Sequence, residues 1–233
     1  MKPVIKIDVV SDVVCPWCYI GKRRLEKAIN ELKDKMDFEV EYHPFELNPE
    51  TPKEGFNHKE YLTKKFGGEE RYQRITNHVV GIAAREGLTF NFSDRQVSPN
   101  TLDAHRLIAF AKLHGKQGEM KEALMNAYFE KGLDLTQDKN LIKVAVEQGL
   151  ESGAVDAFLR SDELTDEVRQ DEQRNYQRGI SGVPFYIINN KYGVSGAQPT
   201  EGFVKALTDI GSELQVNTEA CDTEKRIANR DEC

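Results

Sequence analysis

The strongest constraint on this chain is a pair of cysteines placed where an apolar segment gives way to a helical pattern. Cys15 and Cys18 are separated by Pro16 and Trp17, and the preceding segment, 4–10, is short and rich in β-branched residues. That composition predicts a buried strand. Proline favours the first turn of a helix, and apolar residues recur at helical spacing after it. The sequence therefore predicts a strand-to-helix junction at Cys15, with Cys18 in the first turns of the helix.

This placement favours redox chemistry. Free backbone N–H groups and the positive end of the helix dipole stabilise a thiolate at a helix N-terminus. We expect Cys15, at the exposed junction, to be the attacking thiol, and Cys18, one turn into the helix and more deeply buried, to resolve the mixed disulfide. Asp12 lies three residues before Cys15. It is a candidate proton acceptor for Cys18 or, equally, a carboxylate that caps the loop.

Charge and hydropathy exclude several classes of protein. The net charge of −7, without a broad basic surface, argues against nucleic-acid binding. No apolar segment reaches the roughly 20 residues that cross a bilayer, and residues 1–12 lack a signal-peptide cleavage site. We therefore expect a cytoplasmic protein with no membrane partner. Four cysteines are too few for a disulfide scaffold, so a C-x-x-C pair in a reducing compartment indicates redox activity or metal binding.

The periodicity of the remaining sequence separates an α/β part from a helical part. Residues 38–47 alternate as a second strand, and 88–100 form a long irregular connection that we expect near a groove. The other predicted elements are helices at 69–86, 100–114, 117–131, 138–149, 153–160 and 162–178, strands at 185–189 and 192–195, and a closing helix at 199–211.

The outer segments together have the size of a domain. We therefore expect one discontinuous α/β domain formed by 1–49 and 160–214. An all-helical insertion occupies 50–159, and a polar C-terminal tail follows at 215–233.

Three stretches carry a resemblance to a known family. "VVCPWCYIGKRRLEKA", "SPNTLDAHRLI" and "GISGVPFYII" occur in this order, and they resemble the DsbA-like thioredoxin-fold oxidoreductases, in particular their FrnE-like dithiol-disulfide isomerase branch. The resemblance covers residues 4–212. It implies an α/β thioredoxin-like fold with a large helical insertion, and a Cys15–Cys18 pair that acts on protein or small-molecule thiols and disulfides.

The resemblance also assigns residues to the substrate site. It implies that Pro184 is a cis proline facing the cysteines, which leaves the backbone of Val183 free to pair with an extended substrate. It further implies that Asn100, Thr101 and His105 face the pocket. The alternative for these three is a helix cap with an ordinary surface or core histidine.

Trp17 departs from the pattern of strongly oxidising DsbA proteins, which carry a histidine between the cysteines. An indole cannot stabilise a thiolate as an imidazole can, but it offers a flat apolar surface to a substrate. We therefore expect a redox potential between the thioredoxin and DsbA extremes of about −270 and −120 mV. The Cys15–Cys18 pair is itself the redox centre, so no cofactor is expected, and glutathione or a thioredoxin system would recycle it.

Two further cysteines, Cys221 and Cys233, lie in the polar tail. One interpretation is an auxiliary redox pair that exchanges with Cys15 and Cys18, because tethering gives a high effective concentration. The other is a pair without consequence.

Two alternative functions stay open. Zinc binding would join Cys15 and Cys18 to the tail cysteines or a histidine. Glutathione-dependent chemistry would follow the kappa-class transferases and hydroxychromene-carboxylate isomerases, which share the insertion architecture but typically carry serine at the first cysteine position. The remaining histidines have no metal-ligand spacing and are expected at exposed or capping positions: His43, His58, His78 and His114.

Overall fold

A four-stranded sheet forms the first part of the structure. The computed structural model describes the backbone of residues 2–93 and 95–228 and their side chains up to Leu214. The strands are β1 (Val4–Ser11), β2 (Asp37–Pro44), β5 (Phe185–Ile188) and β6 (Tyr192–Ser195), in the order β2-β1-β5-β6. Strand β1 pairs parallel with β2 and antiparallel with β5, and β6 pairs antiparallel with β5.

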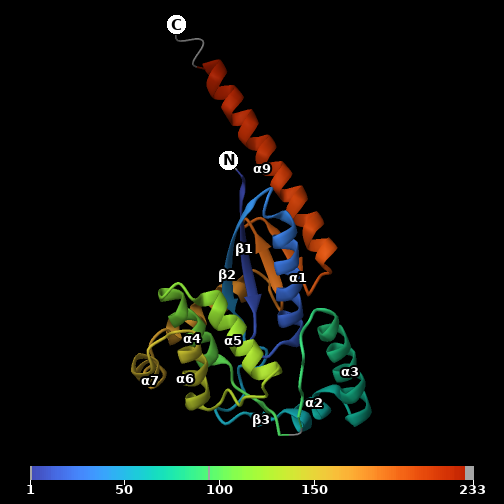
Figure 1. Ribbon diagram of the computed structural model, residues 1–233, viewed down its shortest axis with the longest axis vertical. Coiled ribbons are helices and arrows are strands. Elements are labelled where there is room, and N and C mark those ends of the chain that lie inside the picture. Colours follow the sequence, from blue (N-terminus) through green and yellow to red (C-terminus); the bar gives the residue numbers. More distant parts are fainter. Residues whose placement is uncertain (1, 94, 229–233) are drawn as a thin grey trace.

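Two helices from opposite ends of the chain lie together beside the sheet. They are α1 (Pro16–Leu32) and α9 (Thr200–Ala228) (Figure 1). Burial alternates along the first part of β1, as expected of a strand that a helix layer covers, and the last three residues, Val9 to Ser11, are all buried. The apolar core of this part joins side chains from β1, α1 and α9: Ile5, Ile7, Val9, Leu25, Ala28, Phe203 and Leu207.

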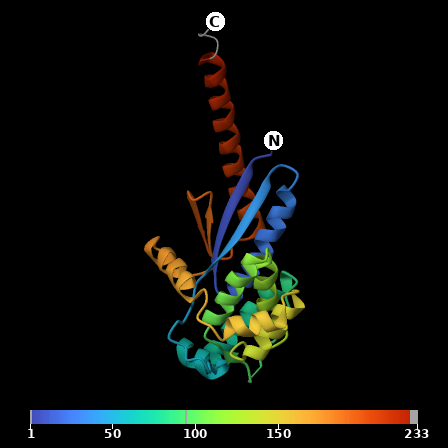
Figure 2. The ribbon, with the colours of Figure 1, turned by 90° about the vertical axis from the view of Figure 1, so that its left-hand side faces the viewer.

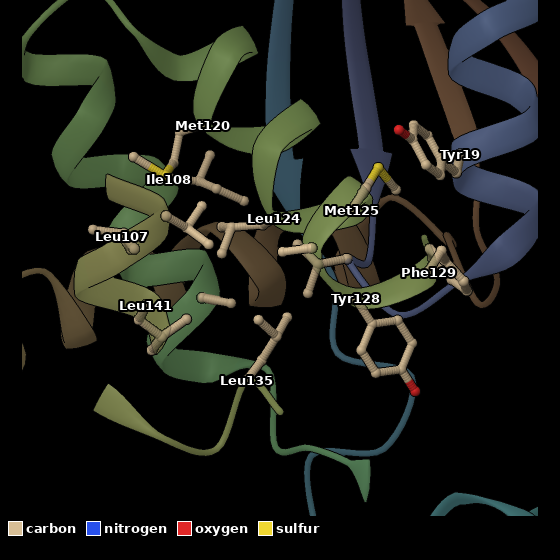
Figure 3. Packing of buried hydrophobic residues seen from close by; sticks show 14 of the residues in the cluster. Tyr19, Leu107, Ile108, Met120, Leu124, Met125, Tyr128, Phe129, Leu135 and Leu141 are labelled. Atoms are coloured by element: carbon tan, nitrogen blue, oxygen red, sulfur yellow. The ribbon is translucent and has the colours of Figure 1, made fainter. Parts of the chain in front are cut away.

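A helical insertion lies between β2 and β5, at the carboxyl end of β1 (Figures 1 and 2). It contains α2 (His58–Phe66), α3 (Glu69–Arg85), α4 (Leu102–Leu113), α5 (Gln117–Phe129), α6 (Asp138–Glu147) and α7 (Ser152–Leu159). Helix α8 (Thr165–Gln177) leads back to the sheet. The insertion's core centres on α4 and α5 (Figure 3), and its members include Leu107, Ile108, Met120, Leu124, Leu135 and Leu141.

Helix α5 joins the insertion to the start of α1. Tyr19 is fully buried, and its ring lies 6.0 Å from that of Phe129 (Figure 3). Its hydroxyl donates to Glu122 at 2.8 Å, and Lys22 forms an ion pair with the same carboxylate at 2.7 Å. The insertion's apolar core continues into the first turn of α1, where it includes Cys15 and Cys18. The two parts of the molecule therefore meet at the cysteine pair.

The sequence predicted the four sheet strands and eight of the helices near their observed positions, but three short elements were not predicted individually. They are α2 and the two-residue strands β3 (Phe56–Asn57) and β4 (Val97–Ser98), which pair with each other antiparallel. Asn57 caps α2, because its side chain accepts a hydrogen bond from the Glu60 amide at 3.0 Å.

The closing helix was predicted to end at 211, and that end point is wrong. The backbone of α9 is helical to Ala228. Gly211 does not end the helix; it allows close packing, since a Cβ there would lie 2.8 Å from the Met36 Cε. Residues 212–228 contain no glycine or proline that would stop a helix.

Gly21→Ala tests the close approach of α1 to β5. A Cβ at Gly21 would overlap the hydroxyl of the fully buried Tyr186 and lie 3.3 Å from Pro184 Cγ. Overpacking of this kind costs about 1–3 kcal/mol, so the free energy of unfolding in urea should fall by that amount.

Gly81→Ala is the matched control in another helix. A Cβ at Gly81 of α3 would meet no atom within 4 Å, so helix propensity alone should stabilise this variant by about 0.5–1 kcal/mol. Two variants that shift in the same direction would contradict the packing argument.

Candidate active site

The cysteine pair occupies the N-terminus of α1. Cys15 is the N-cap residue, with an extended backbone (φ −89°, ψ 113°), and Pro16 follows in the first turn. The amide of Cys18 donates to the carbonyl oxygen of Cys15 at 3.0 Å, and both thiols are free. The first turn contains no acidic residue. The positive end of the helix dipole therefore faces Cys15 without a competing carboxylate in that turn.

The burial of the two thiols differs from the sequence expectation. Cys15 was expected to be exposed, but it is 4% exposed, and Cys18 is 3% exposed. Cys15 is buried because the helical insertion covers the turn that contains it. Only Cys15 of the two lines the large cavity described below. Burial, followed by the hydrogen bond and charge of Cys15, raises the pKa of Cys18 well above its usual range.

The segment before β5 lies opposite the cysteines. The thiol of Cys15 is 3.7 Å from the carbonyl oxygen of Val183, within reach of a weak S–H···O hydrogen bond. The Val183–Pro184 peptide bond is cis. Val183 also lines the cavity, so the backbone preceding β5 and the Cys15 thiol face a shared space.

A cavity of about 410 Å³ extends from Cys15 into the insertion. The irregular connection was expected near a groove, and this prediction is confirmed, since Phe92, Ser98 and Pro99 line the cavity. Trp17 lines it beside Cys15, with its ring 6.4 Å from that of His78. Helices α2 and α3 supply much of the remaining wall, through Tyr61, Leu62, Phe66, Ile75, Thr76 and Val79.

The three residues expected to face this cavity are placed differently from one another. Thr101 lines it. Asn100 does not: its amide donates to the Thr51 carbonyl at 2.9 Å, and its side-chain oxygen accepts from the Leu102 amide at 3.0 Å. His105 is buried and lines a separate cavity of about 200 Å³. The expectation that Asn100 and His105 contact the substrate is therefore wrong for this cavity. Asn100 holds a loop instead, and His105 is buried at another cavity.

These features match a known family. A family model described as the DSBA-like thioredoxin domain matches residues 6–208. The chain belongs to this family. The YwbO protein of Bacillus subtilis strain 168 is 31% identical over 206 residues, which cover 88% of this chain and 96% of YwbO.

Solved structures agree with the DsbA-like assignment. A probable DsbA oxidoreductase, SCO1869 from Streptomyces coelicolor, is 36% identical with a TM-score of 0.83, covering 88% of this chain and 89% of SCO1869. The cytosolic disulfide reductase DsbM from Pseudomonas aeruginosa, solved with GSH, is 17% identical with a TM-score of 0.59, covering 92% of this chain and 99% of DsbM. At that identity DsbM shares the fold. The α/β DsbA-like fold with a helical insertion is thereby established, in a family that acts on thiols and disulfides.

Three charged or titratable side chains lie buried near the DsbA-like cysteine pair. They are Asp12, His105 and Lys121. Asp12 accepts hydrogen bonds from the amides of Leu47 at 2.8 Å and Val14 at 3.5 Å, which is the loop-capping role. His105 Nε2 lies 3.4 Å from the Asp12 carboxylate. Burial acts to raise the pKa of Asp12, but His105, the Leu47 amide and the charge of Lys121 outweigh it and lower that pKa.

Lys121 is a functional candidate that the sequence analysis missed. This residue of α5 is 1% exposed, and its ammonium donates to the Ser11 carbonyl at 3.2 Å. Burial lowers its pKa to about 8, although Cys18, Asp12 and Cys15 act to raise it. A signal was present in the sequence: Lys121 stands where the apolar stripe of Leu124, Met125 and Tyr128 requires a core residue.

His58 was also misjudged, because it was expected at an exposed or capping position. It is buried, lines the cavity and stacks on Phe92 with ring centroids 5.3 Å apart. Its Nδ1 lies 3.0 Å from the Ser98 hydroxyl and 3.2 Å from that of Tyr128. Burial lowers the pKa of His58 to about 4, so the His58 ring is neutral at physiological pH.

The tail cysteines stay untested. The side chain of Cys221 and all of Cys233 lie outside the described residues, so the auxiliary redox pair remains a prediction. Within the described part of the chain, no group of three His, Cys, Asp or Glu residues is placed to hold a metal ion. None of the described helices is long and apolar enough to span a bilayer.

Lys121→Met tests the burial of the ammonium group. The folded pKa of about 8 lies below the usual 10.5, so the unfolded state binds more protons between these values. The contribution of Lys121 to the free energy of unfolding should therefore rise across that pH window, by up to about 3 kcal/mol. Denaturant unfolding from pH 7 to 10 should show the wild type gaining stability relative to the variant.

Lys143→Met, at an exposed position of α6, is the control. Its unfolding free energy should follow that of the wild type across the same pH range. Parallel curves for Lys121→Met and the wild type would show that the ammonium is not buried in its charged form.

Proposed function

We propose that this chain is a thiol–disulfide oxidoreductase in which Cys15 attacks a substrate disulfide and Cys18 resolves the product. One observation carries the proposal: Cys15 caps α1 at the end of a cavity while Cys18 lies outside the cavity lining, with a raised pKa. A substrate in the cavity therefore contacts the Cys15 sulfur, whereas the Cys18 sulfur is available only for the second step. The family membership supports the reaction class.

The reaction exchanges one disulfide bond for another. The thiolate of Cys15 attacks one sulfur of a substrate R–S–S–R′, the substrate S–S bond breaks, and R–S⁻ leaves and takes up a proton. Cys18 then loses its proton and attacks the Cys15 sulfur, which expels R′–S⁻. Two electrons pass from the enzyme dithiol to the substrate, and the enzyme is left as the Cys15–Cys18 disulfide. A thiol or dithiol such as glutathione or a thioredoxin then reduces the Cys15–Cys18 disulfide back to the dithiol. The same steps in reverse oxidise a substrate dithiol.

Lys121 suits the task of assisting the second step. Burial raises the pKa of Cys18, and the positive charge of Lys121 acts to lower it. An amine with a pKa of about 8 is also able to take up a proton near neutral pH, whereas the carboxylate of Asp12, with its lowered pKa, is a weaker base. We therefore assign the supporting role for Cys18 to Lys121, with Asp12 holding the loop.

We further propose that the protein belongs to the FrnE-like branch and acts in the cytoplasm. We also propose that it is able to isomerise disulfides. Trp17 between the cysteines supports a potential between about −270 and −120 mV, because it supplies no imidazole to stabilise the thiolate. A pair of that intermediate potential populates the reduced form that isomerisation needs. The Val183 carbonyl, 3.7 Å from Cys15, is the proposed substrate-aligning group.

The alternative functions have less support. Glutathione-dependent transferases and isomerases typically have serine where this chain has Cys15, and here both thiols are present. Zinc binding would require ligands from outside the described residues.

Cys15→Ser and Cys18→Ser test the assigned roles. In glutathione redox buffers the wild type should titrate as one two-electron couple that is absent from Cys15→Ser. Cys18→Ser should instead accumulate a stable mixed disulfide on Cys15, detected by intact mass. A mixed disulfide that forms on Cys18 in the Cys15→Ser protein at the wild-type rate would reverse the assignment, and no couple in the wild type would refute the function.

Trp17→His tests the origin of the potential. An imidazolium near the Cys15 thiolate stabilises the reduced form, so the couple should become more oxidising by tens of mV, with about 30 mV for each tenfold change in equilibrium constant. Trp17→Phe keeps an apolar ring and should leave the potential near that of the wild type. Equal potentials for all three proteins would show that this position does not set the potential.

A further inference from the structure

The cavity at Cys15 controls access to the nucleophile. Cys15 is 4% exposed, yet it lines a cavity of about 410 Å³. A disulfide that reaches the Cys15 sulfur must therefore place at least one of its substituents in or across this cavity. That volume is in the range of sites for small organic ligands.

The walls of the cavity are mainly apolar and aromatic. The CPWC turn contributes Pro16 and Trp17, Val14 precedes that turn, and α5 contributes Tyr128 and Phe129. Helices α2 and α3 supply the opposite wall, with Leu62, Phe66, Ile75 and Val79 among its residues. Such a surface binds an apolar group by removing both from water, and it offers little that would repay the desolvation of a charge.

Charged partners for a ligand are scarce among the described lining residues. Lys65 is exposed, and its ammonium lies 3.3 Å from the Tyr61 hydroxyl. His58 is neutral above a pH of about 4. The carboxylate of Asp12 is buried and occupied by the Leu47 and Val14 amides. Glutathione carries two carboxylates and one ammonium at neutral pH, so within this cavity most of its charges would lack partners.

We propose that the substrate class of this site is a neutral organic disulfide, or the corresponding thiol, whose apolar alkyl or aryl group fills the cavity. The inference rests on the proposed function, because it uses the same exchange at Cys15. The apolar group occupies the space between the CPWC turn and α2–α3, with its sulfur next to Cys15. Both products leave as neutral thiols, R–SH, after the two exchange steps.

The test is the rate at which small disulfides oxidise the reduced full-length protein. Dibutyl disulfide, 3,3′-dithiodipropionate and glutathione disulfide are compared, with each rate divided by that of free dithiothreitol under the same conditions to remove intrinsic reactivity. Trp17 is the only tryptophan and lies between the two cysteines in the sequence, so its fluorescence reports the reaction. The normalised rate for dibutyl disulfide should exceed the other two by at least tenfold.

Two substitutions of one wall residue connect this preference to the cavity. Thr76 of α3 is half-buried and lines the wall. Thr76→Phe fills the space and should slow dibutyl disulfide at least tenfold. Thr76→Lys places a cation there and should raise the rate for 3,3′-dithiodipropionate relative to dibutyl disulfide. Leu113→Phe, at a position 67% exposed and outside the cavity, is the control and should behave as the wild type does.

The outcomes separate this inference from the function beneath it. If no disulfide oxidises the wild-type pair, the proposed function fails. If all three disulfides react at equal normalised rates, or glutathione disulfide is preferred, the assigned substrate class is overturned while the function stands. An unfolded protein that carries a disulfide and oxidises the reduced pair faster than dibutyl disulfide does, with no effect of Thr76→Phe, would also overturn it in favour of a polypeptide substrate.

Discussion

The packing of the first turn of α1 against α5 is the interaction on which the rest of this structure depends. Tyr19 and Lys22 both contact Glu122, and Lys121, the residue before Glu122, lies buried near Cys18. One helix of the insertion therefore fixes the orientation of α1 and sets the electrostatic environment of the Cys18 thiol. The same packing buries Cys15, so that a substrate reaches its sulfur through the cavity. The insertion therefore forms part of the immediate surroundings of the cysteine pair.

The sequence predicted those parts of the site that local patterns determine. The CPWC turn contains a proline, follows a segment rich in β-branched residues and precedes apolar residues at helical spacing. Its conformation therefore follows from residues close to it in the sequence. The helices and strands with clear periodicity were placed for the same reason. Gly211 shows the limit of such patterns, because a glycine that resembles a helix stop instead makes room for Met36.

The features that depend on tertiary packing were not predicted. His58 has no neighbouring residue pattern that marks it as buried, and its low pKa results from its burial in the folded protein. Asn100 was assigned to the pocket, but the path of the 47–51 segment draws its amide away. Lys121 could have been predicted in part, because the apolar stripe of α5 indicates that its position is buried in the core. Only the fold shows that this core position adjoins a thiol.

The split of the α/β domain has a consequence for the order in which the redox centre forms. Cys15 and its Val183 partner are 168 residues apart in the chain, and Lys121 lies between them. At a synthesis rate of about 5–20 residues per second, the ribosome delivers the two thiols roughly 10–30 s before the Val183 carbonyl. During that interval the segment before β5 cannot cover the thiols, and the insertion becomes available to cover them only as it is synthesised. Newly made chains therefore pass through a stage at which both sulfurs are open to any oxidant, and the surroundings of the ribosome determine the redox state in which the protein first folds.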